Sequence, residues 1–140
     1  MFCRCLLLIS LIGLSVGQTL FAAKVTVPII DQLNEIVEGL VVGQIWKDDT
    51  RVILFVRLSH NIKLTEELKT KIKIKIRAGA SPRHVPAKII QVSDIPRTKS
   101  GKISELAVRD LIHNKEINNQ TALANPECLV EYKNIKELSI

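Results

Sequence analysis

The sequence predicts a small α+β domain in which a small antiparallel sheet is flanked by helices. Two stretches rich in Val, Ile and Leu, residues 40–46 and 51–58, are separated by the polar turn 47–50, which is the pattern of a β-hairpin. Residues 88–92 predict a third, shorter strand. The 140 residues leave room for one domain with a modest core. Because only one Trp, one Tyr and three Phe are present, that core must be built from Ile, Val and Leu.

Helices are predicted on both sides of these strands in the sequence. In residues 29–40, apolar side chains recur at helical spacing, and Gly39 would end the helix. Residues 66–77 allow two interpretations, because Leu68, Ile72 and Ile76 fit a helix while the alternation of isoleucine with lysine fits a strand. Thr65 followed by two glutamates favours the helix. Residues 105–113 predict the last helix.

The charge of the chain is positive and unevenly distributed. The formal net charge is +6, and residues 63–115 contain 13 Lys and Arg against 5 Asp and Glu, a local balance of +8. Such a surface fits an anionic partner, which could be a nucleic acid, a membrane surface or a phosphorylated small molecule, and it also fits a solvated face without a partner. No Cys-x-x-Cys pair and no Cys/His cluster occurs, so no metal site is expected.

The N-terminal segment differs from the rest of the chain. Residues 1–27 read as a hydrophobic leader, in which Arg4 precedes an apolar run and small residues follow at Ala22 and Ala23, the layout of a secretory signal peptide. The globular pattern begins at Pro28. We therefore expect a domain over 28–113 and a C-terminal extension over 114–140. Residues 1–23 alone favour export or membrane attachment.

The segment most informative about chemistry is the loop Pro96–Ile103, called the lysine loop below. Pro96 stiffens its start and Gly101 permits an unusual backbone angle, while Lys102 lies beside Ser100 and Gly101. Such a loop could carry a point charge into the active site of a partner, or it could be an exposed turn with a solvated lysine. It is not a phosphate-binding P-loop, because the upstream glycine is missing.

The pattern Pro-x-Thr-x-Ser-Gly-Lys-Ile, shortly after a proline-rich loop, resembles the C-terminal signature of the adenylate-forming superfamily, which includes acyl-CoA synthetases. The similarity extends over about Leu33 to Leu138. Residues 81–96, 105–109 and 122–127, with Tyr132 after them, are most similar to acetoacetate–CoA ligases.

This resemblance implies a fold and a set of roles. The fold is that of the C-terminal domain of adenylate-forming enzymes. In such a ligase acetoacetate attacks the α-phosphate of ATP, which is bound with Mg, and the thiol of CoA then attacks the acyl-adenylate. By position, Lys102 matches the lysine that stabilises the first transition state, with Ser100 and Gly101 beside it in the nucleotide-contacting loop. Arg77 matches an arginine that touches CoA, although it could equally be a solvated arginine at a helix end.

The resemblance also implies that a large part of the enzyme is not encoded in this sequence. The adenylation domain, which carries the phosphate loop and the acid pocket, is missing, so we expect a truncated fragment that binds no ATP or CoA by itself and is inactive alone. An adenylation domain supplied in trans would be its partner, and the family implies a cytoplasmic location. The alternatives are a small basic nucleic-acid-binding protein and an exported protein. The former is disfavoured because residues 63–115 contain no aromatic side chain for base stacking.

Overall fold

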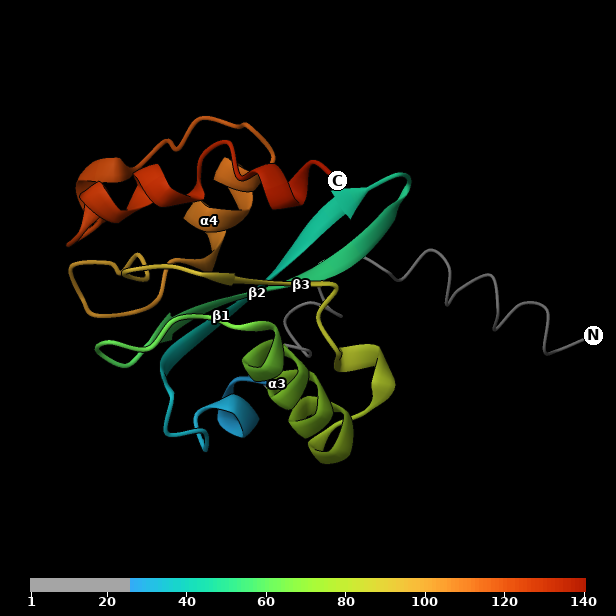
Figure 1. Cartoon of the computed structure of the whole chain (residues 1–140). Helices are drawn as coiled ribbons and strands as arrows, with labels where there is room; N and C mark the ends of the chain where they lie inside the picture. Colours follow the sequence, from blue (N-terminus) through green and yellow to red (C-terminus); the bar gives the residue numbers. More distant parts are fainter. Residues whose placement is uncertain (1–25) are drawn as a thin grey trace, which may run out of the picture.

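The computed structural model describes residues 26–140, and these form an α+β fold (Figure 1). The regular elements are strand β1 (Ile36–Trp46), strand β2 (Asp49–Leu58), helix α3 (Glu66–Gly79), strand β3 (Lys88–Gln91) and helix α4 (Glu105–Ile112). Residues 26–30 are helical, and short 3-10 helices lie at Pro82–His84, Gln120–Ala122, Pro126–Tyr132 and Lys136–Leu138. The predicted class is confirmed. The predicted signal-like leader, residues 1–23, lies outside the described residues.

Strands β1 and β2 form the predicted hairpin. They pair antiparallel from Trp46 opposite Asp49 as far as Ile36 opposite Leu58, with a bulge at Val37. The two turn residues, Lys47 and Asp48, have φ of 48° and 63°. Positive φ at both turn positions is typical of the two-residue turns that match the twist of paired strands. Local turn geometry therefore sets the register of the hairpin.

The sheet is mixed, so the prediction of an antiparallel sheet is wrong for one of its two pairings. Strand β3 pairs with β2 in parallel, with Leu54 opposite Ile89, and the strand order is β1-β2-β3. The physical reason is the connection. Helix α3 lies between β2 and β3 in the chain and returns it to the end of the sheet where β2 began, as a parallel pair requires.

Both faces of the sheet are covered, as the three layers in Figure 1 show. Leu40, Val42, Ile53 and Phe55 pack towards α4 and the C-terminal extension. Their neighbours Val41, Leu54 and Val56 pack towards α3 and residues 26–30 on the other face. Burial on both faces explains why the strands read as continuous apolar runs rather than as alternating patterns.

The predicted helix over 29–40 is wrong, because β1 already begins at Ile36 and helical structure is confined to residues 26–30. Gly39 is a strand residue instead of a helix end. A Cβ atom at this position would overlap the Cδ1 atom of Ile30, so glycine allows the helical segment to pack closely on the strand. The long Val- and Ile-rich run that pairs with β2 outweighs the local helical spacing.

Helix α3 resolves the ambiguity between helix and strand in favour of the helix. The Thr65 hydroxyl accepts a hydrogen bond from the Leu68 amide at 3.2 Å, which is an N-terminal cap. Leu68, Ile72 and Ile76 are buried against the sheet, whereas Ile74 is 63% exposed. No helix within residues 26–140 has the length and apolar character needed to cross a membrane.

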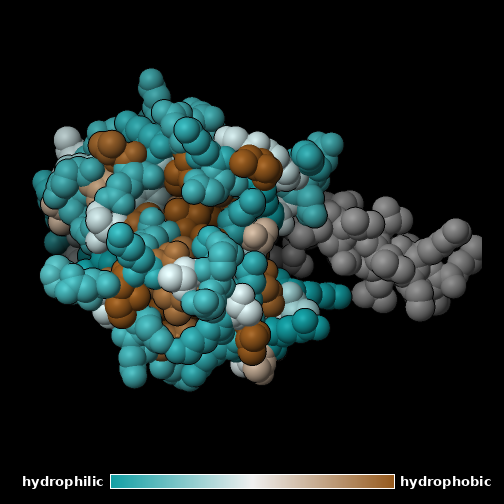
Figure 2. All heavy atoms as spheres, in the orientation of Figure 1, coloured by the Kyte–Doolittle hydropathy of each residue, from teal (hydrophilic) through white to brown (hydrophobic). Residues whose placement is uncertain are grey.

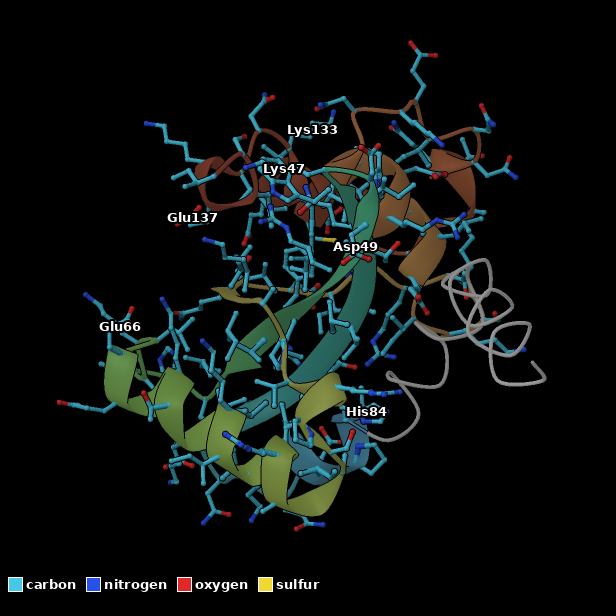
Figure 3. All side chains as sticks on the ribbon, turned by 90° about the vertical axis from the view of Figure 1, so that its right-hand side faces the viewer. Lys47, Asp49, Glu66, His84, Lys133 and Glu137 are labelled. Carbon is cyan, nitrogen blue, oxygen red and sulfur yellow. The ribbon has the colours of Figure 1, made fainter. Side chains whose placement is uncertain are left out.

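The C-terminal extension is an integral part of the core. Four of its buried side chains belong to the same cluster as α4 and one face of the sheet, and they are Leu123, Leu129, Tyr132 and Leu138. The ring of Tyr132 meets that of Phe55 edge to face, with 4.9 Å between the centroids. At the end of the chain, the Arg51 guanidinium donates to the carbonyls of Leu138 and Ile140. In Figure 3, Lys47 and Asp49, next to each other at the hairpin turn, lie in the half of the molecule that also holds Lys133 and Glu137 of the extension.

Candidate functional site

The lysine loop connects β3 to α4 and folds back on itself through backbone hydrogen bonds. The Thr98 amide donates to the Lys102 carbonyl at 2.8 Å, and the Gly101 amide donates to the Thr98 carbonyl at 2.8 Å. The Lys102 amide donates to the Thr98 hydroxyl at 3.2 Å, and that hydroxyl lies 2.9 Å from the Ser100 hydroxyl. Thr98 therefore fixes the main chain on both sides of Lys102.

Gly101 supplies the backbone angle that closes the loop. Its φ is +86°, and a Cβ atom there would meet nothing within 4 Å. Space is thus not the reason for glycine at this position. Only the positive φ, which other residues adopt at a cost, calls for it.

The side chain of Lys102 is exposed at the tip of the loop. Within residues 26–140 its ammonium group forms no ion pair. Ser100 and Gly101, the two predicted neighbours, are exposed beside it. The structure thus presents the Lys102 side chain on a fixed backbone, where it is available to contact a group outside residues 26–140.

Arg97 ties the loop to the sheet. One of its guanidinium nitrogens donates to the Gly101 carbonyl at 2.9 Å, and the other donates to the carboxylate of Glu38 in β1. The Glu38 side chain is only 13% exposed, and its second oxygen lies 3.6 Å from the Arg57 guanidinium. A largely buried carboxylate held by two arginines is a strong anchor, because either partner left alone would be a poorly solvated charge.

The C-terminal extension holds the other edge of the loop. The Lys99 amide donates to the Ala122 carbonyl at 3.0 Å, and the Ala124 amide donates to the Arg97 carbonyl at 2.8 Å. The Asn125 side chain accepts from the Arg97 amide at 2.8 Å and donates to the Ile95 carbonyl at 3.0 Å. Residues 122–125 therefore run beside the start of the loop, joined to it by these hydrogen bonds and by an isolated bridge between Thr98 and Leu123.

Two further contacts from the extension reach the residues just before the loop. The Tyr132 hydroxyl donates to the Asp94 carbonyl at 2.8 Å, and the Glu131 carboxylate accepts from the Ser93 amide at 2.8 Å and from its hydroxyl. Burial of the Tyr132 hydroxyl raises its pKa far above the usual range, so it stays a neutral donor. Sequence reasoning missed this support, and also Glu38, because their partners are distant in the chain.

Arg77, the predicted CoA contact, lies apart from the lysine loop. It is exposed in the last turn of α3, on the face of the sheet opposite α4. Two of the other basic residues of α3 are engaged with acids, since Lys69 pairs with Glu66 and Lys71 with Glu35. The structure thus groups Ser100, Gly101 and Lys102 and leaves Arg77 on a second surface.

A hollow beside the end of α4, lined by residues that include Leu111, Lys115 and Lys133, involves no residue of the lysine loop. The face seen in Figure 2 is mostly hydrophilic, with hydrophobic residues visible in its middle. Among the described residues, no three His, Cys, Asp or Glu side chains are grouped so that they could hold a metal ion.

Known proteins share the sequence and the architecture of this chain. No protein-family model matches the chain. The chain is 59% identical over 109 residues to an acetoacetyl-coenzyme A synthetase of Rhizobium meliloti, with 78% of this chain aligned, and 43% identical over 111 residues to an acetoacetyl-CoA synthetase of Xenopus tropicalis. The chain belongs to the acetoacetyl-CoA synthetase family. The resemblance seen in the lysine-loop motif is thereby confirmed.

Solved structures agree with this membership. An acetoacetyl-CoA synthetase from Streptomyces lividans superposes with a TM-score of 0.72 at 31% identity over 82% of this chain, and a Brucella canis acyl-CoA synthetase with 0.59 at 25% identity over 63%.

The chain spans only about one sixth of the relatives it matches. It aligns with 17% of the R. meliloti synthetase and 16% of the X. tropicalis synthetase. It corresponds to 18% of the S. lividans structure. These proportions are consistent with a C-terminal domain fragment of such an enzyme.

Proposed function

We propose that this chain provides the C-terminal domain of an acetoacetate–CoA ligase and that Lys102 acts in adenylate formation. The observation that carries the proposal is the fixed loop that presents Lys102, in a chain with 59% identity to an acetoacetyl-CoA synthetase. The exposed ammonium group is suited to act on reactants held by another domain, because no carboxylate among residues 26–140 forms an ion pair with it.

In the proposed first step, a carboxylate oxygen of acetoacetate attacks the α-phosphorus of ATP. The bond from that phosphorus to the bridging oxygen breaks, and pyrophosphate leaves with the electron pair. Negative charge then lies on both the carboxylate and the phosphate oxygens. The ammonium group of Lys102, placed between them, stabilises this charge electrostatically. Ser100 and Gly101 flank the lysine and contact the nucleotide side of the site.

In the proposed second step, the thiol of CoA loses its proton to solvent and its sulfur attacks the acyl carbon; the bond from that carbon to the phosphate oxygen breaks, and AMP leaves with the electron pair. The small domain turns between the steps, so that a different surface faces the reactants. Arg77 lies on such a second surface and would bind the nucleotide end of CoA through its charge. Arg77→Ala should then weaken the use of CoA and spare adenylation, whereas an equal loss in both steps would remove this role.

The partner in this proposal is an adenylation domain, joined to the chain or supplied in trans, which binds ATP with Mg and acetoacetate. Both ATP and CoA are cytosolic substrates, so we place the function in the cytoplasm. By itself the chain should form no acetoacetyl-adenylate, because the lysine has no reactants to bridge.

A domain exchange tests the proposal. Residues 26–140 replace the corresponding part of the R. meliloti synthetase, and acetoacetyl-CoA formation from acetoacetate, ATP and CoA is measured. We expect the hybrid to be active and the same enzyme without its C-terminal part to be inactive. The hybrid with Lys115→Ala, an exposed lysine after α4, is the charge control and should match the unmodified hybrid. A folded hybrid without activity would overturn the proposal.

A further inference from the structure

We propose that Asn125, in the C-terminal extension, is a positioning residue for Lys102. This inference rests on the proposed function of Lys102. Pro96 is buried at the start of the lysine loop and has no amide hydrogen. The backbone groups on either side of it, the Ile95 carbonyl and the Arg97 amide, therefore need partners from outside a regular strand ladder.

The Asn125 side chain meets that need. Its Oδ1 accepts from the Arg97 amide at 2.8 Å, while its Nδ2 donates to the Ile95 carbonyl at 3.0 Å and to Asp94 Oδ2 at 2.6 Å. The Asn125 side-chain amide thus forms the two hydrogen bonds that a peptide group of a neighbouring strand would form. Aspartate could not do this, because it lacks the donors.

Thr98 connects the C-terminal extension to the backbone of Lys102. Thr98 forms an isolated bridge with Leu123 of the extension, supported by the Ala124–Arg97 and Lys99–Ala122 hydrogen bonds. On its other side Thr98 binds the backbone of Lys102 twice, through its amide and its hydroxyl. Displacing the start of the loop at Asn125 therefore moves the backbone that aims the ammonium group.

The consequence is specific to one step of the reaction. A lysine that acts only in adenylation is sensitive to small displacements in that step, because electrostatic stabilisation depends on where the charge lies. In the proposed function the adenylation domain supplies most of the binding of ATP, whereas Ser100, Gly101 and Lys102 meet the nucleotide only once the loop is placed for the first transition state. Loss of Asn125 should thus lower the rate of adenylation and leave the KM for ATP unchanged.

The first measurement uses the full chain and follows amide hydrogen exchange residue by residue. Asn125→Ala should speed exchange at Lys99, Gly101 and Lys102 by roughly 10-fold or more and leave the β2 amides of Leu54 and Phe55 unchanged. Asn119→Ala, an exposed asparagine of the extension without a side-chain cap bond, is the matched control and should change neither set. Equal acceleration in the loop and in β2 would reduce Asn125 to a general stabilising residue and overturn the inference.

The second measurement uses the hybrid enzyme and separates this inference from the proposed function. In pyrophosphate exchange, Asn125→Ala should lower kcat by roughly 10-fold at unchanged KM for ATP, while thioester formation from pre-made acetoacetyl-adenylate is unaffected. If Asn125→Ala prevents folding, Tyr132→Phe, which removes the hydroxyl bond to Asp94 and keeps the ring, should show the same pattern to a smaller degree. A hybrid in which Lys102→Ala is harmless overturns the proposed function. A hybrid that is impaired by Lys102→Ala but normal with the extension variant overturns this inference alone.

Discussion

Arg97 binds Glu38, and this pair joins the lysine loop to the beginning of strand β1. The same guanidinium also holds the Gly101 carbonyl, one residue before Lys102. A carboxylate in the sheet therefore anchors the main chain that carries the proposed catalytic charge.

Glu38→Gln should destabilise the domain by about 1–3 kcal/mol, because it leaves the half-buried Arg97 and Arg57 without a counter-charge. Urea unfolding followed by circular dichroism measures the free energy of unfolding. Glu66→Gln is the control, since Glu66 pairs with Lys69 on the exposed surface and its replacement should cost much less stability. Equal losses for the two variants would contradict the anchor role of Glu38.

Gly101→Ala should cost about 1–2 kcal/mol of stability, because alanine must adopt the φ of +86° that glycine adopts freely. Gly101→Asn should cost less, since asparagine tolerates positive φ better. Chemical unfolding of the three proteins provides the ranking. Equal tolerance of alanine and asparagine would contradict backbone strain as the cause, because nothing lies within 4 Å of the added Cβ to explain a difference by crowding.

Gly39→Ala should destabilise the domain by about 1–3 kcal/mol, because the new methyl group would overlap the Cδ1 atom of Ile30. Ile30→Val removes that atom. In the double variant the cost of alanine should therefore be smaller than in the single variant, and a double-mutant cycle measures the difference. Strict additivity would show that the helical segment 26–30 does not pack on β1 at this point.

Cys128 should react slowly with alkylating reagents in the folded chain. Burial, reinforced by the Asp94 and Glu127 carboxylates, raises the pKa of its thiol from 9.0 to about 11. The folded state then holds a proton that the unfolded state loses, so this group's contribution to stability falls as the pH rises from about 9 towards 11. Mass spectrometry of the peptide that contains Cys128 gives the pH profile of alkylation. A midpoint near 9 in both native and denaturing buffer would contradict the burial argument.

The sequence predicted the elements that depend on local patterns. The hairpin follows from two apolar runs and a polar turn, and α3 follows from its cap at Thr65 and the spacing of Leu68, Ile72 and Ile76. The positive φ of Gly101 is also predicted from a local pattern, because glycine in a tight loop commonly supplies a backbone angle that other residues avoid.

The remaining features depend on contacts between distant residues. The parallel pairing of β3 results from the path of α3, and β1 starts early because residues 36–40 pair with β2. The anchors Glu38 and Asn125 lie 59 and 28 residues from their partner Arg97. No single-sequence pattern indicates such pairs. The lysine loop could be predicted from its motif, but the distant residues that anchor it, Glu38 and Asn125, could not.

The half-reactions of the hybrid enzyme with Lys102→Ala test the central claim most directly. Adenylation is measured as pyrophosphate exchange, and thioester formation starts from pre-made acetoacetyl-adenylate and CoA. A positioned charge of this kind contributes about 3–4 kcal/mol, so pyrophosphate exchange should fall roughly 10²–10³-fold while thioester formation stays largely intact. If Lys102→Ala slowed both half-reactions equally, or neither, Lys102 would not be the residue that stabilises adenylate formation.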